Sequence, residues 1–458
     1  MVTQGTRSWP AAILIAAQAC VVACVSSGLE KRLDAARREV GPLSAPPPLP
    51  STETPGLDPA KPVSWANITE LVLARNPRLE SMRAAWRAML ERMPQVVASP
   101  DPSLELGIAP LALPTGRALR IAWRQPRAWA ATLDARGEVV LAEAEGLAKD
   151  REAMARMLVA AANEALVELG TASALRARYH EHHQLMDTLR RGVLAMVAAG
   201  RGMPEDAVMA EAEVLMADRE LIDVTRMERI ALARVNALLH RPATAALGAV
   251  TLPATLPPTP PPLSELVAEA RRARPELAAQ AARIRAREAE LGVADTMGRP
   301  MFGVGAELST MGDDWMMWPM LMVMIELPLA TGKRDAMRDE ARAMIAMQRY
   351  EAEAVGSDIE AEVAMRRAEL EAALQALEQT RTALLPTLER RIQLVQASYA
   401  ANRQDFGEVV RAANALLTAR LELVVYEREA HLSAIGLEVA LGRLVGLPAS
   451  PNPAEVTP

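Results

Sequence analysis

The residues of this chain that could do chemistry are few. Cys20 and Cys24 are its only cysteines, and both lie near the start, so the rest of the chain has no thiol for a disulfide or a zinc site. His180, His182 and His183 form a cluster. His180 and His183 lie three residues apart, which on one helical face permits a metal pair. A solvated histidine patch is the more common meaning of such a cluster.

A row of methionines forms a further group. Met320, Met322 and Met324 alternate along a predicted strand that continues to Glu326. Three thioethers on one strand face would suit Cu(I) or Ag(I). Methionine is also a flexible hydrophobe, and the chain holds 24 of them. A metal cargo and a plain apolar lining therefore both stay open at this point.

No enzyme signature accompanies these residues. The sequence contains no nucleophile elbow, phosphate loop or Cys/His metal signature, so we expect a protein that is not an enzyme and has no cofactor. Half of the 458 residues are hydrophobic and 3% are aromatic, which is typical of long helices rather than a compact α/β enzyme. The net charge is −6 with acids and bases interleaved, and no basic block indicates nucleic acid.

The first 62 residues read as targeting and spacer segments. Residues 1–23 carry Arg7 and then an apolar run too short to span a bilayer, which predicts a cleaved signal peptide. The run ends Val21-Val22-Ala23-Cys24, which resembles a bacterial lipobox and predicts that Cys24 is lipidated; the alternative is ordinary cleavage beside an incidental cysteine. Residues 24–62 would then be a lipid anchor, a short helix over 29–40 and a Pro-rich spacer, because proline favours extended chain.

The remainder of the chain contains the same element order twice. One copy occupies 63–252 and the other 263–448, with a Pro-rich linker over 253–262 and a tail over 449–458. Each copy predicts a helix (67–93 and 263–297), two short strands, a very long helix, a tight turn and a return helix. An offset of about 200 residues is too long for a solenoid repeat and indicates a duplicated half.

The predicted strands alternate in polarity. In 302–309 apolar residues alternate with Gly, Glu or Ser, and in 320–327 an aliphatic row alternates with the methionine row. The first half repeats this pattern less clearly: Leu104, Leu106 and Ile108 oppose a polar face, and Pro110 is expected to shorten that strand. Trp315 and Trp318 lie where an interfacial aromatic belt would lie.

Two isolated hairpins could not bury enough surface to be stable alone. In a membrane every backbone amide must be paired, and only a closed barrel achieves that for strands. Four strands per chain therefore predict assembly with copies of the same chain, and three copies would supply twelve strands, an even number in the known range.

The helices that follow the strands are predicted to be unusually long. Residues 127–199 and 329–401 would each reach roughly 110 Å. Pro386 is expected to bend the second one, because proline removes a backbone hydrogen bond. Return helices are predicted over 204–239 and 406–445.

The residues of the second half resemble a known family. Leu385-Pro386, the run from Tyr399 to Val410, Leu416-Leu417-Thr418-Ala419-Arg420-Leu421 and Leu444-Val445-Gly446 are similar to the closing half of TolC-family outer-membrane efflux proteins, and the resemblance spans 65–448. It implies a mainly α fold with membrane β structure. A homotrimer would form a 12-stranded outer-membrane β-barrel continued by a long α-helical barrel.

The same resemblance implies partners and a location. A periplasmic adaptor and an inner-membrane pump of the RND or ABC type would complete the route. The chain would lie in the outer membrane of a Gram-negative bacterium with a long periplasmic portion, and the lipobox-like run predicts that it is lipid-anchored there.

The resemblance also implies functional positions. The two turns between long and return helices match the tips that the adaptor grips in the family: Gly200, Arg201 and Gly202 in the first half, Asn402, Arg403 and Gln404 in the second. Asp206 and Glu408 match the periplasmic gate. The next acidic position of the family reads Arg411 here, which puts a dense acidic ring in doubt and could instead supply an ion pair that holds the gate shut. Met320, Met322, Met324 and Glu326 are candidates for the lumen lining.

Two other classes of protein stay as alternatives. A periplasmic adaptor could also have a long helical hairpin, but it would lack duplicated strand pairs of membrane length. A structural coiled-coil envelope protein would be a soluble, elongated dimer.

Overall fold

The computed structural model describes residues 27–42, 57–112, 116–310, 317–401 and 403–444. The predicted signal peptide, both cysteines and Trp315 lie outside these residues. The chain divides into two compact units, and each unit draws on both sequence halves. The first unit consists of Met1–Leu43, Met82–Lys149 and Ala278–Glu353, and the second of Ser44–Ser81, Asp150–Leu277 and Ala354–Pro458.

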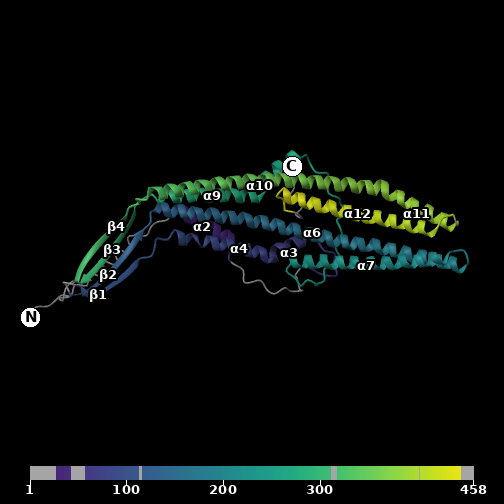
Figure 1. Ribbon diagram of the computed structural model, residues 1–458, viewed down its shortest axis with the longest axis horizontal. Helices are drawn as coiled ribbons and strands as arrows, with labels where there is room; N and C mark the ends of the chain where they lie inside the picture. Colours follow the sequence, from purple (N-terminus) through teal and green to yellow (C-terminus); the bar gives the residue numbers. More distant parts are fainter. Residues whose placement is uncertain (1–26, 43–56, 113–115, 311–316, 402, 445–458) are drawn as a thin grey trace, which may run out of the picture. The chain divides into compact units, whose positions relative to one another are not determined.

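The two halves contain matching elements (Figure 1). The first half has α3 (Trp65–Arg75), α4 (Pro77–Leu90), the short α5 (Met93–Val96), β1 (Ser103–Ala112), β2 (Gly116–Arg127), α6 (Ala130–Ala198) and α7 (Pro204–Leu238). The second half has α8 (Leu263–Ala273), α9 (Pro275–Thr296), β3 (Met301–Thr310), β4 (Met317–Glu326), α10 (Thr331–Gln379), the π-helix η1 (Thr380–Leu384), α11 (Leu385–Ala400) and α12 (Phe406–Ala440). The helix α2 (Ser27–Val40) precedes both, close to the range predicted for it.

The helix before each strand pair differs from the prediction. The ranges 67–93 and 263–297 are each split in two, because Pro77 and Pro275 begin a new helix. Proline disfavours helical backbone in the residue before it. Asn76 and Arg274 accordingly have nearly identical extended dihedrals, with φ of −70° and −71° and ψ of 120° in both.

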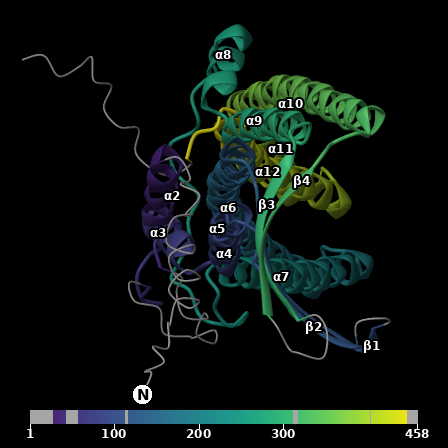
Figure 2. The same ribbon diagram turned by 90° about the vertical axis from the view of Figure 1, so that its left-hand side faces the viewer.

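The four strands of the first unit form one antiparallel sheet in the order β1-β2-β3-β4 (Figures 1 and 2). Each hairpin pairs internally, and β2 pairs with β3 across the two sequence halves, with Trp123 opposite Ala306. Among the described residues, β1 and β4 each have one hydrogen-bonded neighbour. The sheet therefore has two open edges.

The first strand is longer than predicted. It runs through Pro110 to Ala112, with a shift of register between Ala109 and Ala112. A bulge or irregularity is where a sheet tolerates proline, because the residue has no amide to donate to the ladder. Pro110 thus disturbs the pairing without ending the strand.

The long helices lie close to their predicted ranges. The helix α6 has 69 residues and contributes to both units. Among the described helices, it alone has a stretch of 18 residues apolar enough to cross a membrane. About two thirds of that stretch is buried inside the protein. In the second half the equivalent path runs through α10, η1 and α11. Pro386 lies just after η1, so the backbone accommodates the missing amide with a five-residue π segment where a bend was predicted.

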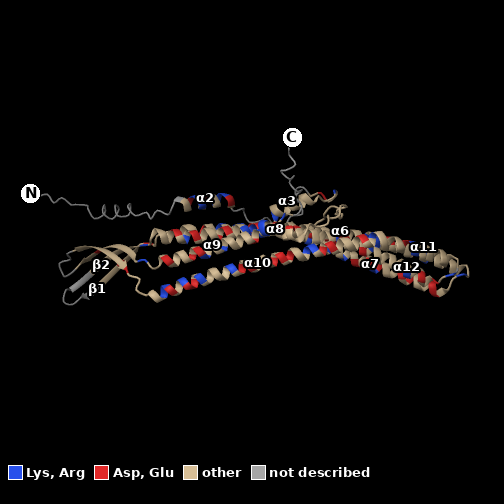
Figure 3. Ribbon diagram, turned by 90° about the horizontal axis from the view of Figure 1, so that it is seen from above, with Lys and Arg blue, Asp and Glu red and all other residues tan. Residues whose placement is uncertain are grey.

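Four helices of the second unit meet in a shared core. Met186 and Val193 of α6 pack with Ala210 of α7, Ile392 of α11 and a row of residues on α12. The two helical hairpins, α6–α7 and α11–α12, are thus packed together in one unit. Acidic and basic residues are interspersed along the helices, whereas the drawn strands are mostly uncharged (Figure 3).

In the first unit, α2 packs through Leu29, Leu33 and Val40 onto α4, α5 and α6. Two ion pairs hold it there. Arg32 pairs with Glu138 at 2.6 Å and Arg37 with Glu91 at 2.5 Å.

Gly442 gives a test of the packing at the end of α12. Its φ is +73°, and a Cβ there would lie 2.9 Å from the carbonyl carbon and oxygen of Ala273. We expect Gly442→Ala to lower the free energy of unfolding by about 1–2 kcal/mol or more, since left-handed backbone costs that much for a residue with a Cβ. The measurement is the thermal or denaturant midpoint in detergent.

Gly28→Ala is the matched control. Its Cβ would meet no described atom within 4 Å, so the midpoint should stay the same or rise slightly. An equal effect of the two substitutions would contradict this account of Gly442.

Candidate functional site

The register of the sheet separates two faces. Ser103 is opposite Arg124, Arg124 is opposite Gly305 and Gly305 is opposite Met322, so these four residues share one face. Their sequence neighbours share the other face. The alternation seen in the sequence is therefore carried across all four strands in phase, which a sheet needs if its two faces are to meet different surroundings.

One face is apolar and exposed. Its large side chains are exposed: the exposed fraction is 86% for Leu321, 73% for Val323 and 73% for Leu104. The other members of this face that are exposed are Leu106, Ile108, Ile121, Phe302, Val304 and Ile325. An exposed aliphatic patch that extends over four strands is unusual for a soluble protein and marks a membrane or protein contact.

The opposite face is polar. Arg120 and Glu307 form an ion pair at 2.7 Å between β2 and β3, and Arg124 pairs with Glu105 between β2 and β1. The side chain of Glu307 is buried, and the guanidinium of Arg120 compensates its charge there. This face can carry charge because Glu105 and Glu307 each have an arginine on the neighbouring strand.

The methionine row lies on the polar face. Met322 is opposite Gly305 and Met324 opposite Gly303, and the two thioether side chains lie over these glycines. A Cβ on Gly303 would meet the Met324 Cε at 2.8 Å, and one on Gly305 would meet the Trp123 carbonyl oxygen at 2.9 Å. The glycines thus make room for the methionines and for close backbone approach.

The first predicted tip is a turn closed by backbone hydrogen bonds. Gly200 has a φ of +70°, and the amides of Arg201 and Gly202 both donate to the carbonyl oxygen of Met196, at 2.9 and 3.2 Å. Glycine is the residue best suited to this left-handed position after a helix. Arg201 is exposed.

The second tip repeats this geometry. The Arg403 amide donates to the Ser398 carbonyl oxygen at 2.9 Å, five residues back, as Arg201 does in the first tip. Asn402 lies outside the described residues, while Arg403 and Gln404 are exposed. Asp405 then caps α12 by accepting a hydrogen bond from the Glu408 amide at 2.7 Å.

Glu408 lies at the centre of a charge cluster within the second hairpin. Its carboxylate accepts from Arg391 of α11 at 2.9 Å and from Arg411 of its own helix at 2.8 Å, and these hydrogen bonds hold its pKa below the usual range. Arg411 also lies 3.8 Å from Asp405. Arg411 therefore forms an ion pair with Glu408, and this pair joins groups of one hairpin.

Tyr399, at the end of α11, is a residue that the sequence analysis did not single out as functional. Burial and then the charge of Asp206 on α7 raise the pKa of Tyr399. The ring of Tyr399 packs against Phe406 with centroids 5.7 Å apart, and its buried hydroxyl has no hydrogen-bond partner among the described residues. The sequence signal was available, since Tyr399 is three residues before the predicted tip.

The histidine cluster does not form a metal site in the described structure. His183 pairs with Asp218 at 3.1 Å and His180 contacts Gln184 at 3.2 Å, so the two have separate partners. His182 is buried rather than solvated. Within the described ranges no group of three or more His, Cys, Asp or Glu is arranged to hold a metal ion. Glu326 of the methionine strand is exposed and lines a cavity described below.

Comparison with known proteins agrees with this architecture. Residues 266–443 match the family model described as outer membrane efflux protein. No match to a curated protein sequence was found.

Several solved structures are similar over most of the chain. The outer-membrane channel OprN shares 18% identity at a TM-score of 0.72, covering 88% of this chain and 98% of its own. VceC, an outer membrane protein of Vibrio cholerae, shares 16% identity at a TM-score of 0.69, covering 83% of this chain and 96% of its own. The open state of the MtrE outer membrane channel of Neisseria gonorrhoeae shares 16% identity at a TM-score of 0.67, covering 88% and 98%.

The buried His182 makes stability depend on pH. Burial, and then the neighbouring His183, lower its pKa below the ordinary value, so the unfolded chain binds a proton more readily than the folded one. The stabilisation is present above a pH of about 6.5 and is lost as the pH falls through the lowered pKa. We expect the thermal midpoint in detergent to fall between pH of about 7.5 and 5.5, and His182→Gln to reduce that fall.

His180→Gln serves as the control, because this neighbour is exposed. His431, whose pKa burial also lowers, accounts for a residual dependence in His182→Gln. An unchanged pH dependence in His182→Gln would rule out His182 as its source.

Proposed function

We propose that this chain is a member of the outer membrane efflux protein family, whose model residues 266–443 match, and that it is the exit duct of an efflux system that crosses the periplasm and the outer membrane. The duct conducts passively and does no chemistry itself. Substrates reach it from an inner-membrane pump through a periplasmic adaptor.

The observation that carries this proposal is the four-stranded sheet with one exposed aliphatic face and two open edges. In hydrocarbon each unpaired backbone amide or carbonyl costs several kcal/mol, so the edges β1 and β4 need partners. Edge β1 of one copy pairs with edge β4 of the next. Three copies close a barrel of twelve strands with the aliphatic face toward lipid.

The polar face lines the lumen of this barrel. The Arg120–Glu307 and Arg124–Glu105 pairs supply charges of both signs there, which suits a duct for varied solutes. The methionine row supplies thioethers to the same lumen. Soft thioethers favour monovalent copper or silver, so a heavy-metal cation is the cargo class that a specific feature of this chain supports.

The hairpin tips are the adaptor contact and the entrance. Arg201 and Arg403 are exposed at equivalent positions of the two turns, which supports a surface that an adaptor grips at both tips. The gate consists of four residues close to these turns: Asp206, Glu408 and Arg411 follow a turn, and Tyr399 precedes one. The Arg391–Glu408–Arg411 cluster keeps the second hairpin closed on itself, and the apolar core shared by α6, α7, α11 and α12 joins it to the first.

A lipid at Cys24 would tether the N-terminal region. Helix α2 begins at Ser27, three residues after Cys24, and is held to the first unit by its buried leucines and two ion pairs. A tethered chain would therefore hold the anchor near the unit that contains the sheet. Mass spectrometry of the mature N-terminus distinguishes a lipidated Cys24 from a plain cleaved end.

The alternatives are disfavoured by the sheet. In an adaptor or a coiled-coil tether surrounded by water, an exposed aliphatic face spread over four strands would be unfavourable. Extraction decides between them: a trimer that requires detergent and conducts ions in planar bilayers supports the duct. Recovery in the aqueous fraction without detergent would remove it.

Charge on the two sheet faces gives a matched test of membrane insertion. Val323→Arg places a cation on the aliphatic face, where it costs about 2–4 kcal/mol at the bilayer midplane. Met320→Arg places the same cation on the polar face, opposite Glu307. We expect Val323→Arg to reduce the amount of assembled trimer in the outer-membrane fraction strongly, and Met320→Arg to leave it close to wild type.

The comparison has a clear opposite result. If both substitutions are tolerated alike, or if Met320→Arg is the more harmful, the aliphatic face is not the lipid face.

The gate is tested by conductance. Glu408→Gln removes the carboxylate that binds Arg391 and Arg411, so we expect a higher open fraction in planar bilayers and a lower preference for cations. Glu422→Gln, elsewhere on α12, is the control with the same chemical change. Wild-type opening and ion selectivity in Glu408→Gln would show that this cluster is not part of the entrance.

A further inference from the structure

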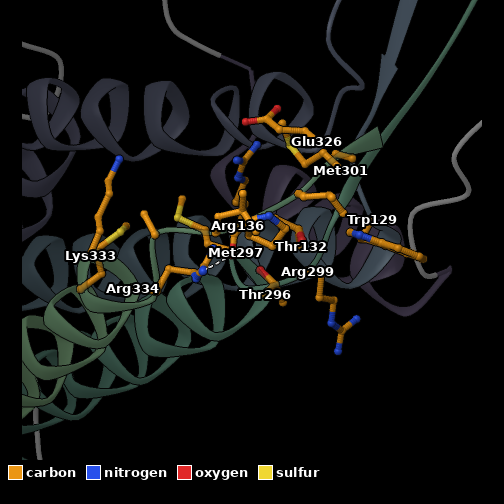
Figure 4. Close-up of a pocket in the computed structure, with 16 residues that line it drawn as sticks. Trp129, Thr132, Arg136, Thr296, Met297, Arg299, Met301, Glu326, Lys333 and Arg334 are labelled. Carbon is orange, nitrogen blue, oxygen red and sulfur yellow. Dashed lines mark hydrogen bonds between the residues drawn. The ribbon is translucent and has the colours of Figure 1, made fainter. Parts of the chain in front are cut away.

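A cavity of about 510 Å³ lies in the first unit where the strands give way to helices (Figure 4). It is lined by the ends of β3 and β4, the last turn of α9 and the starts of α6 and α10. The proposed function makes this the level at which the aliphatic sheet face, and with it the hydrocarbon of the membrane, ends. The headgroup region of the bilayer would lie at this level.

The charge of the cavity is mainly positive. Its lining includes Arg136, Arg299, Lys333 and Arg334, with Glu326 as the acidic member. Arg334 donates to the carbonyl oxygen of Pro328. The other three cations form no ion pair within the part of the chain that the structure describes, whereas nearby Arg338 pairs with Asp295 and Asp335. The cavity therefore carries a net positive charge that a bound anion would neutralise.

Exposed apolar side chains stand beside these cations. Leu329 is 83% exposed and Leu327 60% exposed, and both line the cavity together with Trp129. The Trp129 indole donates to the Pro300 carbonyl oxygen at 2.8 Å, and its ring meets Phe302 edge-on at 5.3 Å. Tryptophan at a membrane interface has this character, with an apolar body and a satisfied polar group. A free inorganic anion would gain no binding energy from these apolar side chains, whereas a lipid would.

The start of α10 is electrostatically unfavourable as it stands. Its first turn carries Lys333 and Arg334 and no acidic residue, although the positive end of the helix dipole lies there. An anion in the cavity would relieve the repulsion between these cations and the helix end. This supports a negatively charged ligand without defining it.

We propose that this cavity binds the phosphate-bearing headgroup of an acidic phospholipid. Arg136, Lys333 and Arg334 contact the headgroup charge, and Trp129, Leu327 and Leu329 contact its glycerol and upper acyl carbons. This inference rests on the proposed membrane position of the sheet. The site would recognise the lipid by charge, so a zwitterionic lipid with the same chains would bind more weakly.

The test measures lipid binding to the detergent-purified full chain. Fluorescent phosphatidylglycerol and phosphatidylcholine with the same acyl chains are titrated against the wild type, the double variant Arg136→Gln/Lys333→Gln, and the control Arg219→Gln/Arg229→Gln. The control removes the same charge from exposed positions on α7. We expect phosphatidylglycerol to bind the wild type and the control roughly tenfold or more tightly than it binds the double variant.

Other outcomes overturn the inference. Equal affinity for the two lipids, or unchanged affinity in the double variant, would exclude a charge-selective lipid site. Displacement of phosphatidylglycerol by millimolar inorganic phosphate would assign the cavity to a free anion instead. A chain that needs no detergent would refute the proposed duct itself, whereas equal binding of both lipids by a detergent-dependent trimer would refute this site alone.

Discussion

The pairing of backbone hydrogen-bonding groups is the constraint on which this molecule depends. A sheet with one aliphatic face exposed is compatible with hydrocarbon, but its two open edges are not. The proposed barrel meets both requirements together, because edges of separate copies pair in it and the polar faces turn inward. In that barrel the ion pairs between adjacent strands would keep the inner charges compensated in a space shared with solute.

The two duplicated halves share one contact between the short helices and the return helix, but different side chains form it. At the proline that splits each pair of short helices, a buried side chain donates to the last turn of the return helix. Asn76 donates to the Leu238 carbonyl oxygen at 3.0 Å, and Arg274 donates to the Ala440 carbonyl oxygen at 2.8 Å. The left-handed residue after each return helix also differs, being His240 in one half and Gly442 in the other. The geometry is retained while the residues that satisfy it have changed.

Periodicity predicted the elements that repeat over many residues. The two strand pairs, the long helices and the return helices follow from alternation or helical spacing, because burial on one face imposes that pattern. Periodicity did not predict the splits at Pro77 and Pro275 or the π segment before Pro386. A proline can break, bend or locally widen a helix, and the tertiary contacts around it determine which of these occurs. The roles assigned to the tip and gate residues came from the family resemblance and stay proposals. Tyr399 and the basic cavity depend on contacts between segments far apart in sequence, which a single sequence does not reveal.

The fit of methionine against glycine on the polar face of the sheet has an evolutionary consequence. Because Met324 occupies the space that a side chain at position 303 would need, the two positions share one volume. A larger residue at 303 is compatible with the fold when a smaller one stands at 324. We therefore expect the two positions to covary among descendants of this sequence, with the bore of the proposed barrel widening or narrowing through compensated exchanges rather than through changes in strand number.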